Sequence, residues 1–357
     1  MKSSMPNPKL QRSFFHDYYA PFIYLVTVTV VDRKPVLCKV DGCVEQPKVV
    51  LTEVGRAVKR EIFAIEKRYP QVKVIFNVIM PDHVHIILRV LEQLPEHLPL
   101  GNIVAAWKQA CGKAYSALLV KQTFGGLKTV GRGTYGDLKA ACPDEQPSAT
   151  NHPSSEASFS SPEKQPQENK PLYTPLFSKG FNDSILTGKH QLRHMLAYVK
   201  DNPRRLLIKR QCRELFAIRR GILVAELKFD AVGNIALLQK PLMAVHCRRK
   251  WTEAEQKAYA EQCISAAEKG VVLVGAFISK EEKNIEQVVL EQRMPIIRLV
   301  ENGFDELFKP VGQDFESCAE GQLLLLAPWP YHSRNSKITR EQCQLLNEMA
   351  ETVALNR

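Results

Sequence analysis

The 357-residue chain has 45% hydrophobic and 24% charged residues, a composition that excludes a disordered, collagen-like or disulfide-stapled protein. Its length suggests two domains. Lys and Arg outnumber Asp and Glu by 34 to 21 in residues 1–230 but not in residues 231–357, where the counts are 15 and 17. The asymmetry predicts a polyanion-binding module joined to a neutral one, because clustered Lys and Arg attract phosphate groups.

The nine cysteines form no CxxC pair and no zinc-finger spacing, so we expect reduced thiols. The first 20 residues lack the apolar core of a signal peptide, and no apolar run approaches the roughly 20 residues that cross a bilayer. We therefore expect a soluble, cytoplasmic protein.

The first 120 residues alternate between strand and helix patterns. Residues 22–31 are almost all β-branched or aromatic and predict a strand. Residues 52–67 have apolar side chains every three or four positions and predict a helix. Residues 72–80 and 83–90 predict two strands joined by a turn at Pro81-Asp82, and residues 100–119 predict a second amphipathic helix.

The middle of the chain is polar and basic. Residues 124–171 contain almost no large apolar side chain and predict a mobile insertion. We expect a helix over residues 189–200, which Asn202-Pro203 ends or bends because the residue before proline avoids helical geometry. A further basic helix is expected from Arg204 to Arg219.

From residue 229 onward, the pattern predicts alternating strands and helices. Strands are expected at 235–238, 271–277, 295–300 and 322–327, and helices at 252–268, 280–292 and 339–355, with Thr252 and Thr339 as helix N-caps. Because these strands are apolar on both faces, we expect a parallel sheet covered on both sides.

Two histidines stand two positions apart in the segment Met-Pro-Asp-His-Val-His. In a strand, His83 and His85 project to one face while Val84 and Ile86 project to the other. The adjacent imidazoles would form half of a site for a divalent metal. The alternative is a pair of surface histidines on an edge strand.

A second cluster has a spacing of four residues: His190, His194, Tyr198 and Asn202. This spacing places Tyr198 and Asn202 on one side of a helix. A phenol facing a metal is a plausible arrangement for phosphoryl transfer. The alternative is a core Tyr198 with a satisfied hydroxyl, and a phenol is a poor nucleophile without activation.

Together these segments resemble the single-tyrosine HUH transposases, especially the REP-associated tyrosine transposase branch, over about residues 12–210. The likeness includes Tyr-x-x-x-Phe-Ile-Tyr-Leu-Val-Thr-Val, the His-Val-His segment, Lys-Gly-Phe-Asn-Asp at 179–183 and Tyr-x-x-x-Asn-Pro. It implies an α+β fold, with an antiparallel sheet and helices forming a ferredoxin-like catalytic domain over residues 1–220.

The resemblance also implies a site and a reaction. His83, His85 and Asn202 would bind Mg²⁺ or Mn²⁺, and Tyr198 would attack single-stranded or hairpin DNA to form a 5′-phosphotyrosine and a free 3′-hydroxyl. His194 is a candidate base for the phenol, although a structural role is favoured. The family includes enzymes that act as monomers and enzymes that act as homodimers.

Basic residues in this part are candidates for contacts with the DNA backbone, and we predict this role for Lys108, Lys113, Arg204, Arg205, Lys209, Arg210 and Arg213. Trp107 and Tyr115 are candidates for stacking on unpaired bases. For Trp107 a core position is favoured, because apolar residues surround it in the sequence.

Residues 230–357 are expected to form a Rossmann-like α/β domain, loosely similar to DNA-processing protein A and to nucleotide-sensing proteins. The helix that starts after Ser279 is a candidate phosphate site. Because GxGxxG and GxxxxGK[ST] are absent, we interpret this domain as a binding or docking module.

Two other functions compete with the nicking and joining enzyme. The first is a catalytically silent DNA-binding regulator derived from a transposase, which would not need His83, His85, Tyr198 and Asn202 together. The second is a small-molecule enzyme centred on residues 230–357, which would require a cofactor fingerprint that the sequence lacks.

Overall fold

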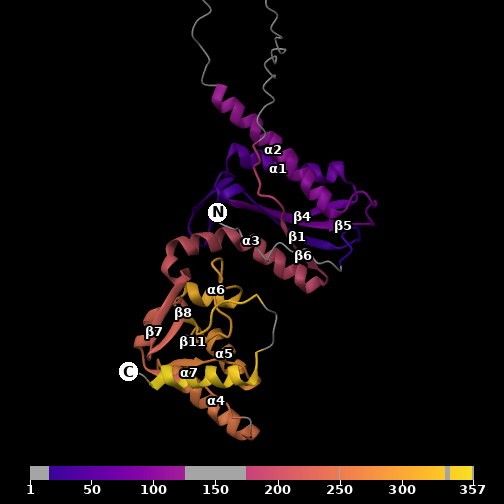
Figure 1. Cartoon of the computed structure of the whole chain (residues 1–357). Helices are drawn as coiled ribbons and strands as arrows, with labels where there is room; N and C mark the ends of the chain where they lie inside the picture. Colours follow the sequence, from indigo (N-terminus) through magenta and orange to yellow (C-terminus); the bar gives the residue numbers. More distant parts are fainter. Residues whose placement is uncertain (1–15, 125–173, 249, 334–337, 356–357) are drawn as a thin grey trace, which may run out of the picture. The chain divides into compact units, whose positions relative to one another are not determined.

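The computed structural model describes residues 16–124, 174–248, 250–333 and 338–355 (Figure 1). These residues form two compact units. The N-terminal unit comprises residues 16–39, 49–124 and 174–200, and the C-terminal unit comprises residues 40–48 and those from 201 onward. The predicted insertion at 124–171 lies outside the described residues, except for its first position.

A four-stranded antiparallel sheet forms the centre of the N-terminal unit, in the order β4-β5-β1-β6. Its strands are β1 (Ile23–Thr29), β4 (Val72–Ile79), β5 (His83–Val90) and β6 (Asn182–Leu186). The first three lie where the sequence predicts strands, whereas β6 and the two-stranded hairpin β2 (Cys38–Gly42) and β3 (Pro47–Leu51) were not predicted.

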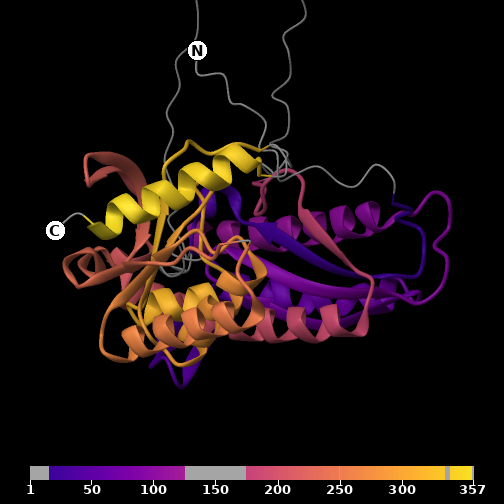
Figure 2. The same cartoon turned by 90° about the horizontal axis from the view of Figure 1, so that it is seen from below.

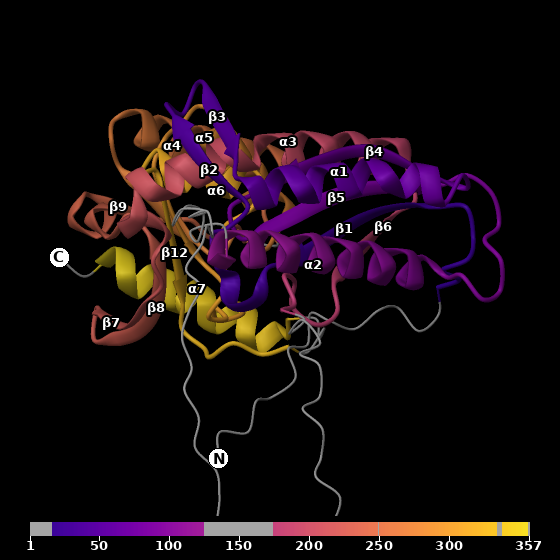
Figure 3. The same ribbon diagram turned by 90° about the horizontal axis from the view of Figure 1, so that it is seen from above.

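One face of this sheet packs against α1 (Glu53–Arg68) and α2 (Leu100–Phe124), which lie over it in Figure 3. Tyr24, Val26 and Val28 of β1 point into this core, and so do Val84 and Ile86 of β5. The predicted helices are confirmed at these positions. Thr52 caps α1 by accepting a hydrogen bond from the Gly55 backbone N–H.

The opposite face of the sheet packs against the first part of α3 (Lys189–Gln211), as Figures 1 and 2 show. Leu25 and Ile87 on the sheet and Val199 on the helix are buried in this second, smaller core, to which Leu192, Met195 and Leu196 also contribute. Alternate residues of β1 and β5 therefore pack against different helices, one set against α1 and α2 and the other against α3.

We expected Asn202-Pro203 to end or bend the helix, and of these two alternatives the end is wrong, because the helix continues to Gln211. A proline inside a helix costs roughly 3 kcal/mol, but buried residues on both sides of it, Val199 and Leu207, stabilise the helical form. The predicted helix from Arg204 to Arg219 is also too long. Its last part forms a 3-10 turn, η3 (Arg213–Phe216), and the start of β7 (Arg219–Val224).

The C-terminal unit contains a six-stranded sheet in the order β7-β8-β12-β11-β10-β9. The strands β10 (Val272–Gly275), β11 (Ile296–Leu299) and β12 (Leu323–Ala327) are parallel, as predicted, and β9 (Leu242–Ala244), which was not predicted, is parallel to β10. The sequence did not predict the antiparallel strands β7 and β8 (Leu227–Gly233), which extend the sheet beyond β12. The molecule is thus a mixed α+β protein.

Helices cover both faces of this sheet (Figure 3). The helices α4 (Glu253–Glu268), α5 (Lys280–Glu291) and α6 (Gln313–Ala319) pack on one face, and α7 (Arg340–Leu355) packs on the other. The predicted strand at 235–238 is instead a 3-10 helix, η4 (Ile235–Gln239), because the Asn234 side chain caps its first turn. No described helix is long and apolar enough to cross a membrane.

Candidate active site

The strand β5 places His83 and His85 on the sheet face that α3 covers. Their ring centroids lie 4.8 Å apart, while Val84 and Ile86, which alternate with them, are buried beneath α1 and α2. Because β5 lies between β4 and β1, the alternative of two histidines on an edge strand is wrong. The alternation places both imidazoles on one surface, as predicted.

Each imidazole is oriented by a hydrogen bond at Nδ1. His83 Nδ1 lies 2.7 Å from Asp82 Oδ1, and His85 Nδ1 lies 2.8 Å from the Thr27 hydroxyl. Thr27 lies directly opposite His85 in the pairing of β1 with β5. Neither Nε2 atom forms a hydrogen bond with the described residues, so both have an available position for a ligand.

The surroundings of His85 favour its neutral form, and those of Asp82 favour the ionised carboxylate. Burial, and then the nearby His83, lower the pKa of His85 to about 3. Burial alone would raise the pKa of Asp82, but hydrogen bonds and charges from His83 and Arg33 lower it to about 2. The neutral imidazole is the form that binds metal ions, so His85 is in the binding-competent state at neutral pH.

Tyr198 lies beside the histidines on α3. Its ring centroid is 6.0 Å from that of His85, and 38% of the residue is exposed. The alternative of a tyrosine sealed in the core is therefore wrong. The neighbouring Val199 anchors the helix on the sheet, and this anchoring places Tyr198 at the edge of the apolar contact, beside the imidazoles.

The other predicted members of the tyrosine cluster lie on the same helix. His194 is exposed one turn before Tyr198, which agrees with the favoured structural reading. Asn202 follows Tyr198 by one turn, is partly buried and belongs to the C-terminal unit. Its role as a metal ligand stays a prediction. The described residues contain no group of three or more His, Cys, Asp or Glu side chains that could hold a metal.

Three polar neighbours of the histidines were missed by sequence reasoning. Thr27 and Thr29 lie opposite His85 and His83, and Asn182 of β6 lies on the far side of Thr27. The signal was present in β1, where threonine alternates with valine in Val-Thr-Val-Thr-Val. Such alternation indicates that the strand has one apolar and one polar face.

Two lysines on α2 were predicted to contact DNA. The half-buried Lys108 donates hydrogen bonds to the carbonyl oxygens of Ser178 and Gly180, at 2.5 and 2.6 Å, whereas Lys113 is exposed. Trp107 is 1% exposed and stacks on Phe177, so its favoured core position is confirmed. DNA contacts by both lysines stay predictions.

The later part of α3 uses its basic side chains within the C-terminal unit. Arg204 pairs with Asp201 and Glu316, at 2.6 and 2.5 Å. The Arg205 guanidinium lies 3.7 Å from the ring centroid of Phe315, which Lys209 also approaches at 5.8 Å, and Arg210 donates to the Val40 carbonyl at 2.9 Å. These residues stabilise the unit that contains them, and their role in DNA binding stays a prediction.

Comparisons with known proteins found partial likenesses. No family model and no curated protein matches the sequence. A solved structure of a REP-associated tyrosine transposase bound to a REP hairpin is 14% identical, with a TM-score of 0.27 over 54% of this chain and 73% of that one. DNA processing protein A from Helicobacter pylori, described for its single-stranded DNA binding, is 15% identical, with a TM-score of 0.29 over 40% of this chain and 67% of that one. Likenesses at these TM-scores assign neither family nor function.

Proposed function

We propose that the N-terminal unit is a metal-dependent enzyme that nicks and joins single-stranded or hairpin DNA, in the manner of a single-tyrosine HUH transposase. The observation that carries the proposal is the juxtaposition of three side chains. His83, His85 and Tyr198 come from two elements more than 100 residues apart in sequence, yet their rings are neighbours.

The residues fit a divalent metal because both imidazoles have a free Nε2 and an Nδ1 fixed by a hydrogen bond. His83 and His85 would hold Mg²⁺ or Mn²⁺, and Asn202 stays the predicted third ligand. When bound, the metal would supply a Lewis acid for the non-bridging oxygens of a DNA phosphate. A site with few ligands suits an exchangeable catalytic metal better than structural zinc.

Tyr198 supplies the nucleophile in this proposal. Its phenol oxygen forms a bond to phosphorus and loses its proton to solvent, while the bond between phosphorus and the 3′-oxygen breaks and that oxygen takes up a proton. The products are a 5′-phosphotyrosine and a free 3′-hydroxyl. Because one phosphodiester replaces another, a 3′-hydroxyl can reverse the step and rejoin DNA without an external energy source.

The C-terminal unit has a supporting role in this proposal. Its parallel strands, with helices on both faces, are compatible with a Rossmann-like domain that helps to hold DNA or a partner.

The proposal is tested by searching for the covalent intermediate. The protein is incubated with Mn²⁺ or Mg²⁺ and end-labelled hairpin DNA, and a labelled adduct that survives denaturation is sought. Tyr198→Phe should abolish the adduct, and His83→Ala or His85→Ala should reduce it at least tenfold. Tyr331→Phe is the matched control, because Tyr331 is similarly exposed in the other unit.

Two results would count against the enzyme. An adduct that persists in Tyr198→Phe would remove the assigned nucleophile. DNA binding without any adduct, over a panel of hairpins and both metals, would favour the catalytically silent regulator.

A further inference from the structure

The half-buried Lys108 of α2 holds the backbone of the segment that leads into β6. Its Nζ atom donates hydrogen bonds to the carbonyl oxygens of Ser178 and Gly180, at 2.5 and 2.6 Å. An ammonium group has three N–H donors, so these two bonds leave only one for any other partner. Burial also lowers the pKa of the Lys108 ammonium. The side chain is therefore used mainly within its own unit, and the predicted contact with DNA would depend on the remaining donor alone.

The segment before β6 forms a bulge at the edge of the sheet. Phe177 pairs with Val30, and Asn182 pairs with Thr27. The five steps from Phe177 to Asn182 therefore face the three steps from Thr27 to Val30, and two extra residues are accommodated between the paired positions. Gly180 has a φ of 76°, in the left-handed region that favours glycine. Extra residues at a sheet edge commonly bend the backbone beside functional sites.

The bulge lies beside the candidate active site. The Ser178 N–H donates to the Thr29 carbonyl at 2.9 Å, and Thr29 pairs with His83 in the neighbouring strand. Because neighbouring strands lie about 5 Å apart, the bulge and the histidine strand are separated by about 10 Å. A DNA strand bound at the histidines has further phosphates within this distance, since successive phosphates of one strand rise about 3.4 Å in a duplex.

Lys179 supplies a positive charge at the bulge. It is exposed and forms no ion pair or hydrogen bond with the described residues. It stands between Ser178 and Gly180, the two residues whose carbonyl groups Lys108 holds, so a displacement of Lys108 would also move Lys179. Lysine side chains commonly contact the phosphate oxygens of DNA.

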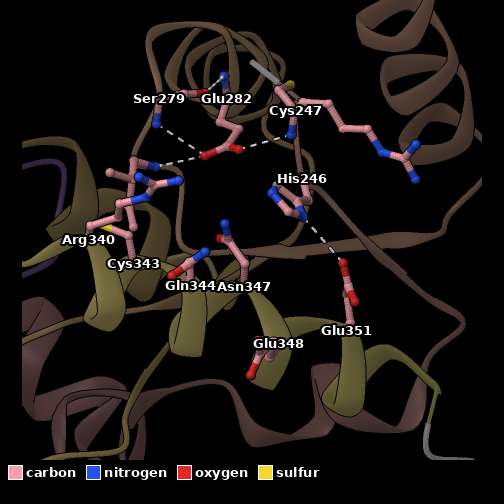
Figure 4. Close-up of a pocket in the computed structure, with 12 residues that line it drawn as sticks. His246, Cys247, Ser279, Glu282, Arg340, Cys343, Gln344, Asn347, Glu348 and Glu351 are labelled. Atoms are coloured by element: carbon pink, nitrogen blue, oxygen red, sulfur yellow. Dashed lines mark hydrogen bonds and ion pairs between the residues drawn. The ribbon is translucent and has the colours of Figure 1, made fainter. Parts of the chain in front are cut away.

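A pocket of about 540 Å³ in the C-terminal unit is less suited to a phosphate (Figure 4). The buried Glu282 accepts hydrogen bonds from the backbone N–H groups of Ile278 and Ser279, at 2.9 and 3.1 Å. The phosphate site that the sequence suggested after Ser279 is therefore occupied by the protein's own carboxylate. Two further glutamates offset the charge of the two arginines that line the same pocket. We therefore place the phosphate contact in the N-terminal unit.

We propose that Lys108 is a positioning residue, which fixes the bulge at residues 178–181 so that Lys179 contacts a backbone phosphate of DNA bound at the candidate active site. The inference rests on the proposed function of that site and names the part of the protein that holds the strand next to it. Lys179 acts on DNA directly, and Lys108 acts through the two carbonyl groups that it binds. Loss of either lysine should therefore remove the same phosphate contact.

A double-mutant cycle in the full-length protein tests this coupling. The affinity for a fluorescent hairpin DNA is measured by anisotropy at several salt concentrations, with EDTA present so that no strand is cleaved. Lys108→Met and Lys179→Ala should each reduce the slope of log affinity against log salt concentration by about 1, and the double variant should reduce it by no more than about 1. Two independent contacts would instead reduce the slope by about 2 in the double variant. Lys73→Ala, at an exposed lysine on the opposite edge strand β4, should leave the slope unchanged.

Hydrogen exchange followed by mass spectrometry reports on the bulge itself. Lys108→Met should accelerate exchange over residues 178–182 at least tenfold, whereas Lys179→Ala should leave it unchanged. Gly180→Ala keeps both lysines but strains the left-handed backbone, and it should reduce the salt slope as Lys108→Met does. If Lys108→Met does not fold, Gly180→Ala provides the same test with both positive charges in place.

Additive slope changes in the double variant, an unchanged slope in Lys179→Ala, or unaltered binding by Gly180→Ala overturns the proposal. An effect of Lys73→Ala equal to that of Lys179→Ala also overturns it, because the loss of any positive charge would then be sufficient. Hairpin binding that follows these expectations without a Tyr198 adduct contradicts only the proposed cleavage. Adduct formation together with an unchanged slope in Lys179→Ala contradicts only this inference.

Discussion

The hydroxyl of Thr27 lies 2.8 Å from Nδ1 of His85 and connects two neighbouring strands of the sheet through their side chains. The bond holds a largely buried imidazole in one orientation, with its ring centroid 6.0 Å from that of Tyr198. The Thr27 hydroxyl thus fixes the orientation of the His85 ring, and the Asp82 carboxylate fixes the orientation of the His83 ring in the same way. The orientation of the pair is therefore built into the sheet before any metal binds.

Replacing Thr27 with valine should weaken metal binding. Thr27→Val keeps the shape of the side chain but removes the hydrogen bond, so the affinity for Mn²⁺ should fall by about tenfold. Electron paramagnetic resonance of free Mn²⁺ measures the affinity directly. Thr29→Val is the control, because Thr29 lies on the same face of β1 and forms no side-chain hydrogen bond to a histidine. Equal effects of the two variants would contradict the role of Thr27.

Gly55 should not tolerate alanine, although alanine usually stabilises a helix. A Cβ atom at Gly55, in the first turn of α1, would lie 1.9 Å from the Leu37 carbonyl oxygen. Gly55→Ala should therefore lower the free energy of unfolding by about 1–3 kcal/mol. Gly188→Ala is the control, since a Cβ there would meet no atom within 4 Å. Urea denaturation followed by circular dichroism compares the two.

Arg205 should matter for stability. Its residue is 9% exposed, and its guanidinium lies on the Phe315 ring and donates to the Pro310 carbonyl. Arg205→Ala should lower the free energy of unfolding by about 1–2 kcal/mol through the loss of a cation–π contact and packing. Arg213→Ala, at an exposed arginine nearby in sequence, should change it by less than about 0.5 kcal/mol. Chemical denaturation of both variants checks the difference.

Lys113 should matter for DNA binding and not for folding. It is exposed on α2, so Lys113→Ala should leave the melting temperature unchanged. If Lys113 contacts a phosphate, the slope of log affinity against log salt concentration should decrease by about 1. Fluorescence anisotropy with a labelled hairpin at several salt concentrations gives the slope. An unchanged slope, equal to that of the Lys269→Ala control, would remove Lys113 from the interface.

The cysteines should differ sharply in reactivity. Burial, followed by nearby carboxylates, raises the pKa of the Cys247 and Cys318 thiols to about 12. Because a raised pKa leaves very little thiolate at pH 8, iodoacetamide should modify these residues only after denaturation. The exposed Cys43 should react in the native protein. Mass spectrometry of the peptides identifies the modified sites, and rapid native labelling of Cys318 would contradict the prediction.

Periodicity predicted the elements whose two faces differ in polarity. In β5, His83 and His85 alternate with Val84 and Ile86, and this alternation defined both the strand and the face of the histidines. The predictions of secondary structure were wrong where they rested on only a few residues. The apolar run at 235–238 is ambiguous between helix and strand, and the Asn234 cap decided it. The continuation of α3 past Pro203 was not predicted, because the burial of Val199 and Leu207 on either side of it is a tertiary effect.

In the candidate site, too, some features could be predicted from the sequence and others could not. The sequence could indicate His83, His85 and Tyr198 from spacing and residue type. It could not indicate the bond from Thr27 to His85, because that contact depends on the register of β1 against β5. Nor could it show that Lys108 binds the carbonyl oxygens of Ser178 and Gly180, about 70 residues further along the chain.

The alternation in β5 also limits how this segment can vary among natural sequences. Inserting or deleting one residue after His85 within β5 (His83–Val90) would turn either both imidazoles or the residues from Ile87 onward to the wrong face of the sheet. A change of two residues would preserve the two faces and only move the pair along the strand. Length variants that retain the histidines are therefore expected to differ by even numbers in this strand.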